Sequence, residues 1–418
     1  MVDKLQRPDF VVGTLPNGLR WIHQQVASPT GHIGILLPVG SRDEAPEEEG
    51  LAHFIEHLLF KGTTRRKAYH ILSRIEDVGG ELNAYTGKED TTLYASFLVP
   101  HYGRSMELLF DILQNARFPE KEIPKEKDVI LDEIDSYRDS PSELIFDEFD
   151  ALVYGDHPLG RNILGTEDSV PTFTREQVVN FVRTHYRPER AVLSSVGGIS
   201  AKQFERMALK YAASWTVDGP VASRLAAPAA RVASEHRPMD IHQSHVVLGG
   251  EGMHVHHDDL TAMVLLNNLL GGPAMNSRLN LNIRERHGIA YHIESFFNPY
   301  SDTGLWGVYA GTDGETMDRC HSLILRELKQ LRDKRLGSLQ FNKAKTQLMG
   351  QMALAQESNG SLMTALGKSL MTFNRVDTFA EMATKVDRVT PAQLQEVANQ
   401  IFDPKRISEL RFVPTESD

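Results

Sequence analysis

Apolar positions along the chain form a series of runs that occurs twice. Residues 31–39 (GHIGILLPV) are typical of a buried strand, and after a polar loop residues 50–60 are typical of an apolar helix. Residues 245–249 (HVVLG) and 260–270 start the same series again. A glycine-containing turn, a helix ending near a glycine and two strands follow in both halves. The offset stays at about 210 residues, which indicates a duplicated domain.

The repeated series predicts an α+β fold of two homologous domains, each an antiparallel sheet with helices packed on one face. Between the two series, residues 216–238 are rich in Ala, Pro, Ser, Arg and Val and show neither a helical nor a strand period. We interpret this segment as a linker. The expected domains are therefore residues 1–215 and residues 239–418.

The first apolar helix carries a small polar cluster. His53 and His57 are four residues apart and share a helix face, and Glu56 lies beside them. The neighbouring positions are apolar, so the helix should be buried, and buried groups of this kind need partners or a metal. The pattern therefore favours a metal site, although a histidine pair solvated on a helix face remains an alternative.

A second helix is expected between Pro124 and Pro141, and it places two glutamates on its apolar face. An unpaired carboxylate on such a face is costly, and a zinc ligand would explain one of them. Two histidines and one carboxylate leave a coordination position for water, as catalytic zinc sites do. The alternative is that both glutamates pair with buried Arg or Lys. The residues of the stripe are Glu126, Val129, Ile130, Glu133, Ile134 and Tyr137.

The H-x-x-E-H pattern and its context resemble the insulinase/pitrilysin family of zinc peptidases, in particular the short subgroup related to mitochondrial processing peptidase. In that family a glutamate about 76 residues after the second histidine is the third ligand, and Glu133 lies 76 residues after His57. The resemblance covers essentially the whole chain. Its motifs are residues 50–63 (GLAHFIEHLLFKGT), 82–86 (LNAYT) and 158–165 (PLGRNILG).

The resemblance implies a role for each residue of the metal site. His53, His57 and Glu133 would bind zinc, and Glu56 would be the catalytic base. Glu126, seven residues before Glu133, would support the site electrostatically.

The second half should bind no metal, because residues 260–270 contain no histidine. We therefore expect one zinc ion per chain. A cluster of histidines at residues 254–257 is interpreted as a solvated loop.

The resemblance also implies residues that contact the substrate. Arg284 and Tyr291 match an Arg and Tyr pair that would bind substrate oxygens and stabilise the oxyanion. Asn83, Ala84 and Tyr85 match an edge strand that would bind an extended peptide by β-augmentation. From the residues alone, all five are also consistent with ordinary helix and strand positions.

The expected function is a zinc-dependent endopeptidase that hydrolyses short or unstructured peptides inside an enclosed chamber. A homodimer, or a heterodimer with a zinc-free homologue, is expected from the family. The alternative is a non-catalytic family member that serves as a structural or partner subunit. A carboxylate-bridged di-iron protein is disfavoured, because it would need two Glu-x-x-His motifs on a helix bundle.

Composition narrows the remaining choices. The net charge of −11 argues against nucleic-acid binding, and the single cysteine excludes an internal disulfide and a cysteine-based metal site. No stretch approaches the roughly 20 apolar residues of a membrane span, so no membrane partner is expected. Residues 1–8 contain no apolar signal region, so we expect a cytoplasmic protein.

Overall fold

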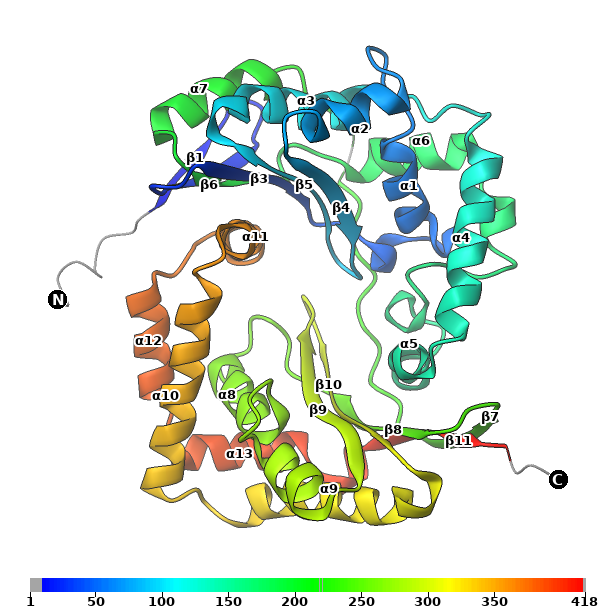
Figure 1. The fold of residues 1–418 in the computed structure, drawn as a ribbon, viewed down its shortest axis with the longest axis vertical. Helices are drawn as coiled ribbons and strands as arrows, with labels where there is room; N and C mark the ends of the chain where they lie inside the picture. Colours follow the sequence, from blue (N-terminus) through cyan, green and yellow to red (C-terminus); the bar gives the residue numbers. More distant parts are fainter. Residues whose placement is uncertain (1–9, 218, 220, 416–418) are drawn as a thin grey trace. The chain divides into compact units, whose positions relative to one another are not determined.

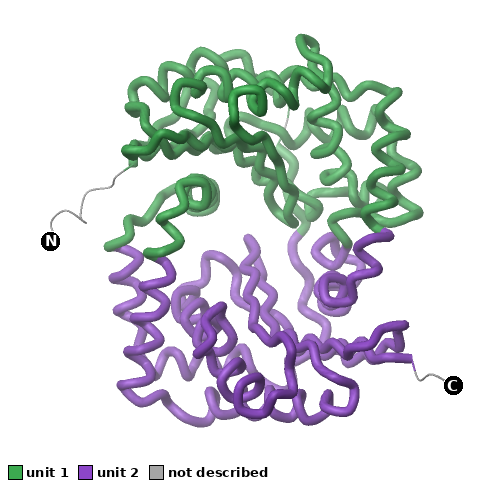
Figure 2. The backbone as a smooth tube through the Cα atoms, in the orientation of Figure 1, with its two compact units in different colours: residues 1–134, 162–225, 353–380 green, residues 135–161, 226–352, 381–418 purple. Residues whose placement is uncertain are grey.

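The computed structural model describes residues 10–217, 219 and 221–415 of the chain. The expectation about a signal region at the N-terminus falls on residues outside this range. The chain folds into two compact units (Figure 2). Neither unit is continuous in sequence. Unit 1 comprises the described parts of residues 1–134, 162–225 and 353–380, and unit 2 those of residues 135–161, 226–352 and 381–418.

Unit 1 contains a sheet whose described strands have the order β1-β2-β6-β3-β5-β4, so β4 lies at an edge. Helices from the first half of the chain cover one face of this sheet, as predicted (Figure 1). The strands are β1 (Phe10–Thr14), β2 (Arg20–Gln25), β3 (Thr30–Leu37), β4 (Glu81–Thr86), β5 (Thr91–Leu98) and β6 (Val192–Gly197). The helices are α1 (Leu51–Leu59), α2 (Ala68–Glu76), α3 (Tyr102–Asn115), α4 (Ile123–Arg138), α6 (Arg175–His185) and α7 (Ala201–Ala212).

Unit 2 repeats this plan with a sheet in the order β7-β11-β8-β10-β9. Its strands are β7 (Ser234–Met239), β8 (Ser244–Glu251), β9 (Ala290–Pro299), β10 (Gly304–Thr312) and β11 (Ser408–Pro414). One face of this sheet is covered by helices that include α8 (Leu260–Gly271), α9 (Met317–Asp333), α10 (Ser338–Ala355) and α13 (Pro391–Ile401). The second half also contains α12 (Phe379–Arg388) and a π-helix (Asn280–Glu285).

Both sheets are mixed, which corrects the prediction of purely antiparallel sheets. In unit 1, β2 and β6 pair in parallel, and in unit 2 β7 and β11 do so. The remaining pairs are antiparallel. Parallel neighbours require a long crossover, and most of the chain of unit 1 separates β2 from β6. Apolar periodicity identifies a strand but carries no information on its direction.

The second face of each sheet is covered by a helix from the other half of the sequence. In unit 1, α11 (Asn359–Phe373) packs on β2, β3 and β6 opposite α3 and α7 (Figure 1). In unit 2, α5 (Pro141–Tyr154) packs on β8 and β11. Residues on one strand alternate between the two cores: Trp21 faces the helices of the first half, and Ile22 faces α11.

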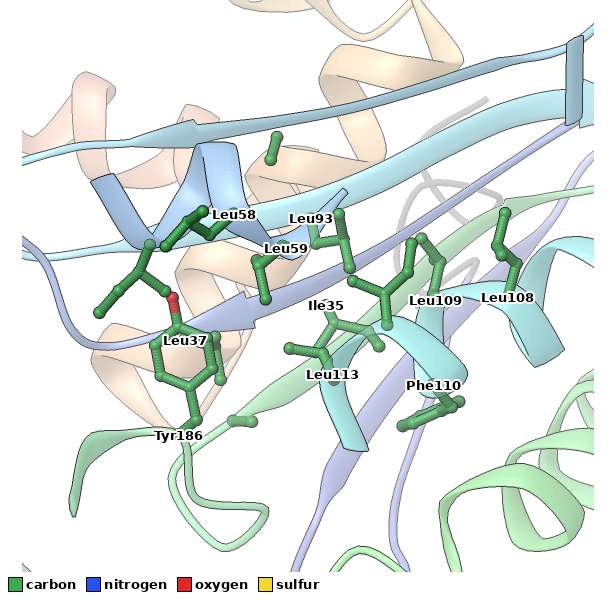
Figure 3. Close-up of a cluster of buried hydrophobic side chains, with 14 of the residues drawn as sticks. Ile35, Leu37, Leu58, Leu59, Leu93, Leu108, Leu109, Phe110, Leu113 and Tyr186 are labelled. Atoms are coloured by element: carbon green, nitrogen blue, oxygen red, sulfur yellow. The ribbon is translucent and has the colours of Figure 1, made fainter. Parts of the chain in front are cut away.

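The main core of unit 1 lies between α1, α3 and the sheet. Figure 3 shows Leu58 and Leu59 of α1 beside Leu93 of β5 and Ile35 of β3, and all four are buried. This apolar contact fixes α1 against the sheet. The orientation of α1 determines where its polar residues point.

The predicted linker is only partly irregular. The chain passes from unit 1 to unit 2 between Leu225 and Ala226, within the expected segment 216–238. Strand β7 begins at Ser234 and pairs with β11, so the end of the segment is regular, contrary to the prediction. Residues 218 and 220 lie outside the described residues.

Candidate metal centre

Helix α1 begins where two of the sequence motifs meet. Gly50 precedes the helix with a left-handed φ of 93°, and a Cβ there would lie 2.6 Å from the Cα of Gly165. Only glycine fits both this backbone conformation and this approach. The buried carboxylate of Glu44 accepts hydrogen bonds from the backbone N–H groups of Gly50 (3.0 Å) and Ala52 (2.7 Å). It therefore satisfies donors at the helix N-terminus, which fixes the start of α1.

The polar cluster of α1 agrees with the sequence prediction. All residues of the helix are buried except Glu56 and His57, which are half-buried. The rings of His53 and His57 lie 4.7 Å apart between centroids. The alternative of a histidine pair solvated on a helix face is therefore not what the structure has.

The buried stripe of α4 is narrower than predicted. Glu126, Ile130 and Ile134 are buried, but Val129 is 46% exposed and the side chain of Glu133 is 44% exposed. Burial follows the i, i+4 row formed by Glu126, Ile130 and Ile134, which faces the core of unit 1, and Glu133 lies at the border of this row. At that border its carboxylate can face the histidines and remain open to a ligand.

His53, His57 and Glu133 direct one ligand atom each to a common point. The Nε2 atoms of His53 and His57 lie 4.0 Å and 3.7 Å from Oε2 of Glu133, and all three ligand atoms lie within 4.8 Å of one another. These distances are too long for hydrogen bonds. Ligands on zinc in a tetrahedron are separated by about 3.4 Å, since each bond is near 2.1 Å. The site is slightly wider than this, and its donor set fits zinc.

Protonation also suits metal binding at His53. Burial, and secondarily the charge of His57, lowers the pKa of His53 to about 3. The ring is therefore neutral at pH 7, as a ligand must be.

Glu126 contacts His57 at Nδ1, whereas Nε2 of the same ring is the atom near Glu133. Its Oε2 lies 3.4 Å from Nδ1 of His57, and its Oε1 lies 2.6 Å from Nζ of Lys61. The alternative prediction, that the glutamates of α4 pair with Lys or Arg, is therefore correct for Glu126. Glu133 instead faces the two histidines.

Glu56 is held beside the metal ligands by a residue of the sheet. The hydroxyl of Thr86, the last residue of β4, donates a hydrogen bond of 2.5 Å to Oε2 of Glu56. Burial raises the pKa of Glu56 above its usual value, and the hydrogen bond from Thr86 partly offsets this. A carboxylate with a raised pKa is a stronger base, which suits a group that accepts a proton near neutral pH.

The predicted peptide-binding residues lie on an edge strand. Asn83, Ala84 and Tyr85 belong to β4, which among the described strands pairs only with β5. The outer edge of β4 is therefore available for a further strand. The same strand carries Thr86, so a peptide added at this edge would lie next to Glu56.

Arg284 and Tyr291 belong to unit 2. Arg284 is an exposed residue of the π-helix, and Tyr291 is 55% exposed on β9. The hydroxyl of Tyr291 donates to both carboxylate oxygens of Asp313, at 3.0 Å each. Their role at the substrate stays a prediction.

The second half has no comparable metal site among the described residues. Among all the described residues, the one group of three side chains that could hold a metal is His53, His57 and Glu133, in the first half. In the loop before α8, His254 and His257 each accept a backbone N–H at Nδ1, as loop residues commonly do. Helix α8 contains Asn267 and Asn268 and no histidine.

Sequence reasoning missed three residues that hold the site in place: Glu44, Lys61 and Thr86. Lys61 lies four residues after His57, within the motif at residues 50–63, and Thr86 is the last residue of the motif at residues 82–86. Lys61 contacts Glu126 of α4, and Thr86 contacts Glu56 of α1. The hydrophobic periodicity of a sequence does not predict such contacts between separate elements. Only the polar character of Thr86 and Lys61 beside apolar runs could have drawn attention to them.

Comparison with known proteins assigns both halves of the chain. Residues 22–167 match the model of the insulinase family (peptidase family M16), and residues 172–348 match the model of the peptidase M16 inactive domain. The uncharacterized zinc protease YmxG of Bacillus subtilis is 33% identical over 392 residues, with 93% of this chain and 95% of that protein covered. The probable mitochondrial-processing peptidase subunit beta of Arabidopsis thaliana is 32% identical over 416 residues, with 97% and 78% covered.

Solved structures share the fold. A protease from Helicobacter pylori has a TM-score of 0.90 at 22% identity, with 98% of this chain and 100% of that chain covered. No helix of the described residues has the length and apolar character needed to cross a bilayer. The family models, the identities of the relatives and the histidine–glutamate cluster agree, and the chain belongs to peptidase family M16, the insulinase family.

Proposed function

We propose that the protein is a zinc-dependent endopeptidase that hydrolyses short or unstructured peptides. The observation that carries this proposal is the convergence of His53, His57 and Glu133 on one point with Glu56 beside them and not among them. This division would separate the groups that hold a metal from the group that moves a proton. The names of the relatives, which include zinc proteases and a processing peptidase subunit, support it.

The residues of unit 1 divide the reaction between them. Zinc held by His53, His57 and Glu133 would supply a Lewis acid that polarises a carbonyl and lowers the pKa of water. Glu56 would accept a proton from the attacking water and donate it to the leaving amine. Thr86 would hold the carboxylate of Glu56 in position for both transfers.

The edge of β4 would bind the substrate as an added strand. Backbone hydrogen bonds would supply most of the affinity, so the preference for particular side chains should be weak. A folded protein rarely offers a free extended segment, so unstructured peptides are the expected substrates. The enclosed chamber, the dimer and the cytoplasmic location expected from the sequence stay predictions.

The experiment measures cleavage of a quenched fluorescent unstructured peptide before chelation, after chelation and after zinc is added back. The proposal predicts activity, its loss and its return, with internal cleavage sites in the products by mass spectrometry. Activity that survives complete metal removal would contradict it. An inactive protein that binds zinc and copurifies with a homologous chain would instead favour the alternative, a non-catalytic subunit.

A further inference from the structure

Lys61 forms the end of a chain of contacts that leads to a metal ligand. It lies just past the end of α1, where its backbone N–H bonds to the carbonyl of Leu58 at 3.1 Å. Its ammonium group lies 2.6 Å from one oxygen of Glu126, whose other oxygen lies 3.4 Å from Nδ1 of His57. The order of contacts is therefore ammonium, carboxylate and imidazole.

Burial makes this lysine important for Glu126. The side chain of Glu126 is only 6% exposed, while that of Lys61 is 29% exposed and can leave part of its length in solvent. A carboxylate this buried is costly unless a cation or several donors compensate it. Lys61 supplies that cation, so it holds the carboxylate of Glu126 in place beside His57.

The carboxylate of Glu126 in turn orients His57, whose Nδ1 it contacts at 3.4 Å. A carboxylate at Nδ1 favours the tautomer with the proton on Nδ1, which leaves the lone pair of Nε2 free for a metal. That Nε2 lies 3.7 Å from Oε2 of Glu133, on the side where the ligands converge. His53 has no such support, because its buried Nδ1 lacks a hydrogen-bond partner among the described residues. Outer support at the site therefore concentrates on His57.

We propose that Lys61 is a positioning residue that sets the zinc affinity of the site by holding Glu126 against His57. This inference rests on the proposed function in that zinc is the ion bound there. It makes a prediction of definite sign. An ammonium group acting only by its charge would repel a cation, so its removal would tighten zinc binding. A positioning residue does the reverse, and its removal weakens binding.

The test measures zinc affinity by competition with a chromophoric chelator. Lys61→Met should weaken zinc binding about 10-fold, the scale found when outer partners of metal ligands are removed. Lys61→Arg, which retains the positive charge, should restore affinity to within about 3-fold. Lys125→Met is the matched control, because this exposed lysine pairs with Glu122 at 3.1 Å and should leave the affinity unchanged.

A double-mutant cycle tests whether Lys61 acts through Glu126. In Glu126→Gln the partner charge is gone, so adding Lys61→Met should produce no further loss of zinc affinity. This pair also avoids a buried unpaired carboxylate, so it remains informative if Lys61→Met alone does not fold. The nitrogen resonances of His57 in the metal-free protein should show the Nδ1–H tautomer in the wild type and a mixture in Lys61→Met.

Three results would overturn the inference: unchanged or tighter zinc binding in Lys61→Met, equal losses in both backgrounds of the cycle, or no rescue by Lys61→Arg. None of these measurements uses a peptide. A protein that shows the expected cycle and yet cleaves no peptide would retain this inference and refute the proposed function.

Discussion

At the scale of single residues, the site depends on contacts between α1 and its neighbours. His53, Glu56 and His57 come from one helix, and their common face follows from their spacing. Their pattern could be predicted from the sequence. Periodicity placed Glu126 and Glu133 on one face of the second helix, and the family resemblance selected Glu133 as the ligand. Thr86 and Lys61 could not be predicted, because each acts on a residue of another element.

Thr86→Val should lower kcat about 10-fold or more, because it removes the hydrogen bond that positions Glu56, the proposed base. The zinc content should not change, since Thr86 contacts no ligand atom. Steady-state kinetics with metal analysis checks both expectations.

Thr86→Ser retains the hydroxyl and is the control, with kcat near that of the wild type. A Thr86→Val protein with full kcat would show that the contact seen here does not position the base.

At the scale of elements, the strands and helices near the site could be predicted from apolar runs, since both follow periods of burial. The sequence does not predict that β6 runs parallel to β2, or that α11 packs on the sheet of unit 1. Both depend on how the chain crosses between elements. Helix α11 is amphipathic like any surface helix, and nothing in its sequence says which sheet it covers.

Gly367→Ala should destabilise unit 1 by about 1–2 kcal/mol, although alanine normally favours a helix by up to about 1 kcal/mol. A Cβ at Gly367 of α11 would lie 2.6 Å from Leu36 Cδ1 and 2.9 Å from Ser194 Cβ, which is too close. Chemical denaturation measures the difference. Gly360→Ala on the same helix is the control, because its Cβ would meet nothing closer than 3.4 Å and stability should hold or rise slightly.

The contact of α9 with β11 should make unit 2 sensitive to acid through Glu409. Burial alone would raise the pKa of this carboxyl, but the hydrogen bonds and charges of His321 and Arg411 outweigh it and hold the pKa at about 2. Because the folded-state pKa is depressed, this stabilisation is present above about pH 4.5 and is lost as the pH falls toward 2.

Glu409→Gln should therefore lower the free energy of unfolding by about 1–2 kcal/mol at pH 7, a value that allows for solvent screening. The difference in the free energy of unfolding between Glu409→Gln and the wild type should be smaller at pH 3. At that pH, Glu409 is already protonated in the unfolded wild type. Urea denaturation at the two pH values gives both differences. An equal difference at pH 7 and pH 3 would mean that the charge of Glu409 contributes nothing to the stability of the protein.

At the scale of the whole molecule, the sequence predicts two related halves, and the structure adds that each compact unit takes a helix from the other half. The chain changes units at several places, and one of them, between Leu225 and Ala226, lies within the predicted linker at residues 216–238. Composition does not predict that α5 and α11 each pack on the sheet of the unit formed mainly by the other half of the sequence. A helix needs the same apolar stripe whichever sheet it covers.

Residues 1–215 alone should therefore fail to form a stable monomer. Without α11, the apolar residues Ile22, Val192 and Val196 lose the helix residues that bury them. Size-exclusion chromatography and thermal unfolding of this fragment should show aggregation or a low, broad transition. A monomer with a cooperative transition like that of the full chain would contradict the role assigned to α11.

The most direct test of the account compares Glu56→Gln with the wild type. Both proteins are loaded with zinc, their metal content is measured, and both are given the same unstructured peptide. If Glu56 is the catalytic base and not a metal ligand, as proposed, the zinc content should be equal and kcat should fall about 100-fold or more in Glu56→Gln. Equal activity in the two proteins would contradict the account, since the base would then lie elsewhere.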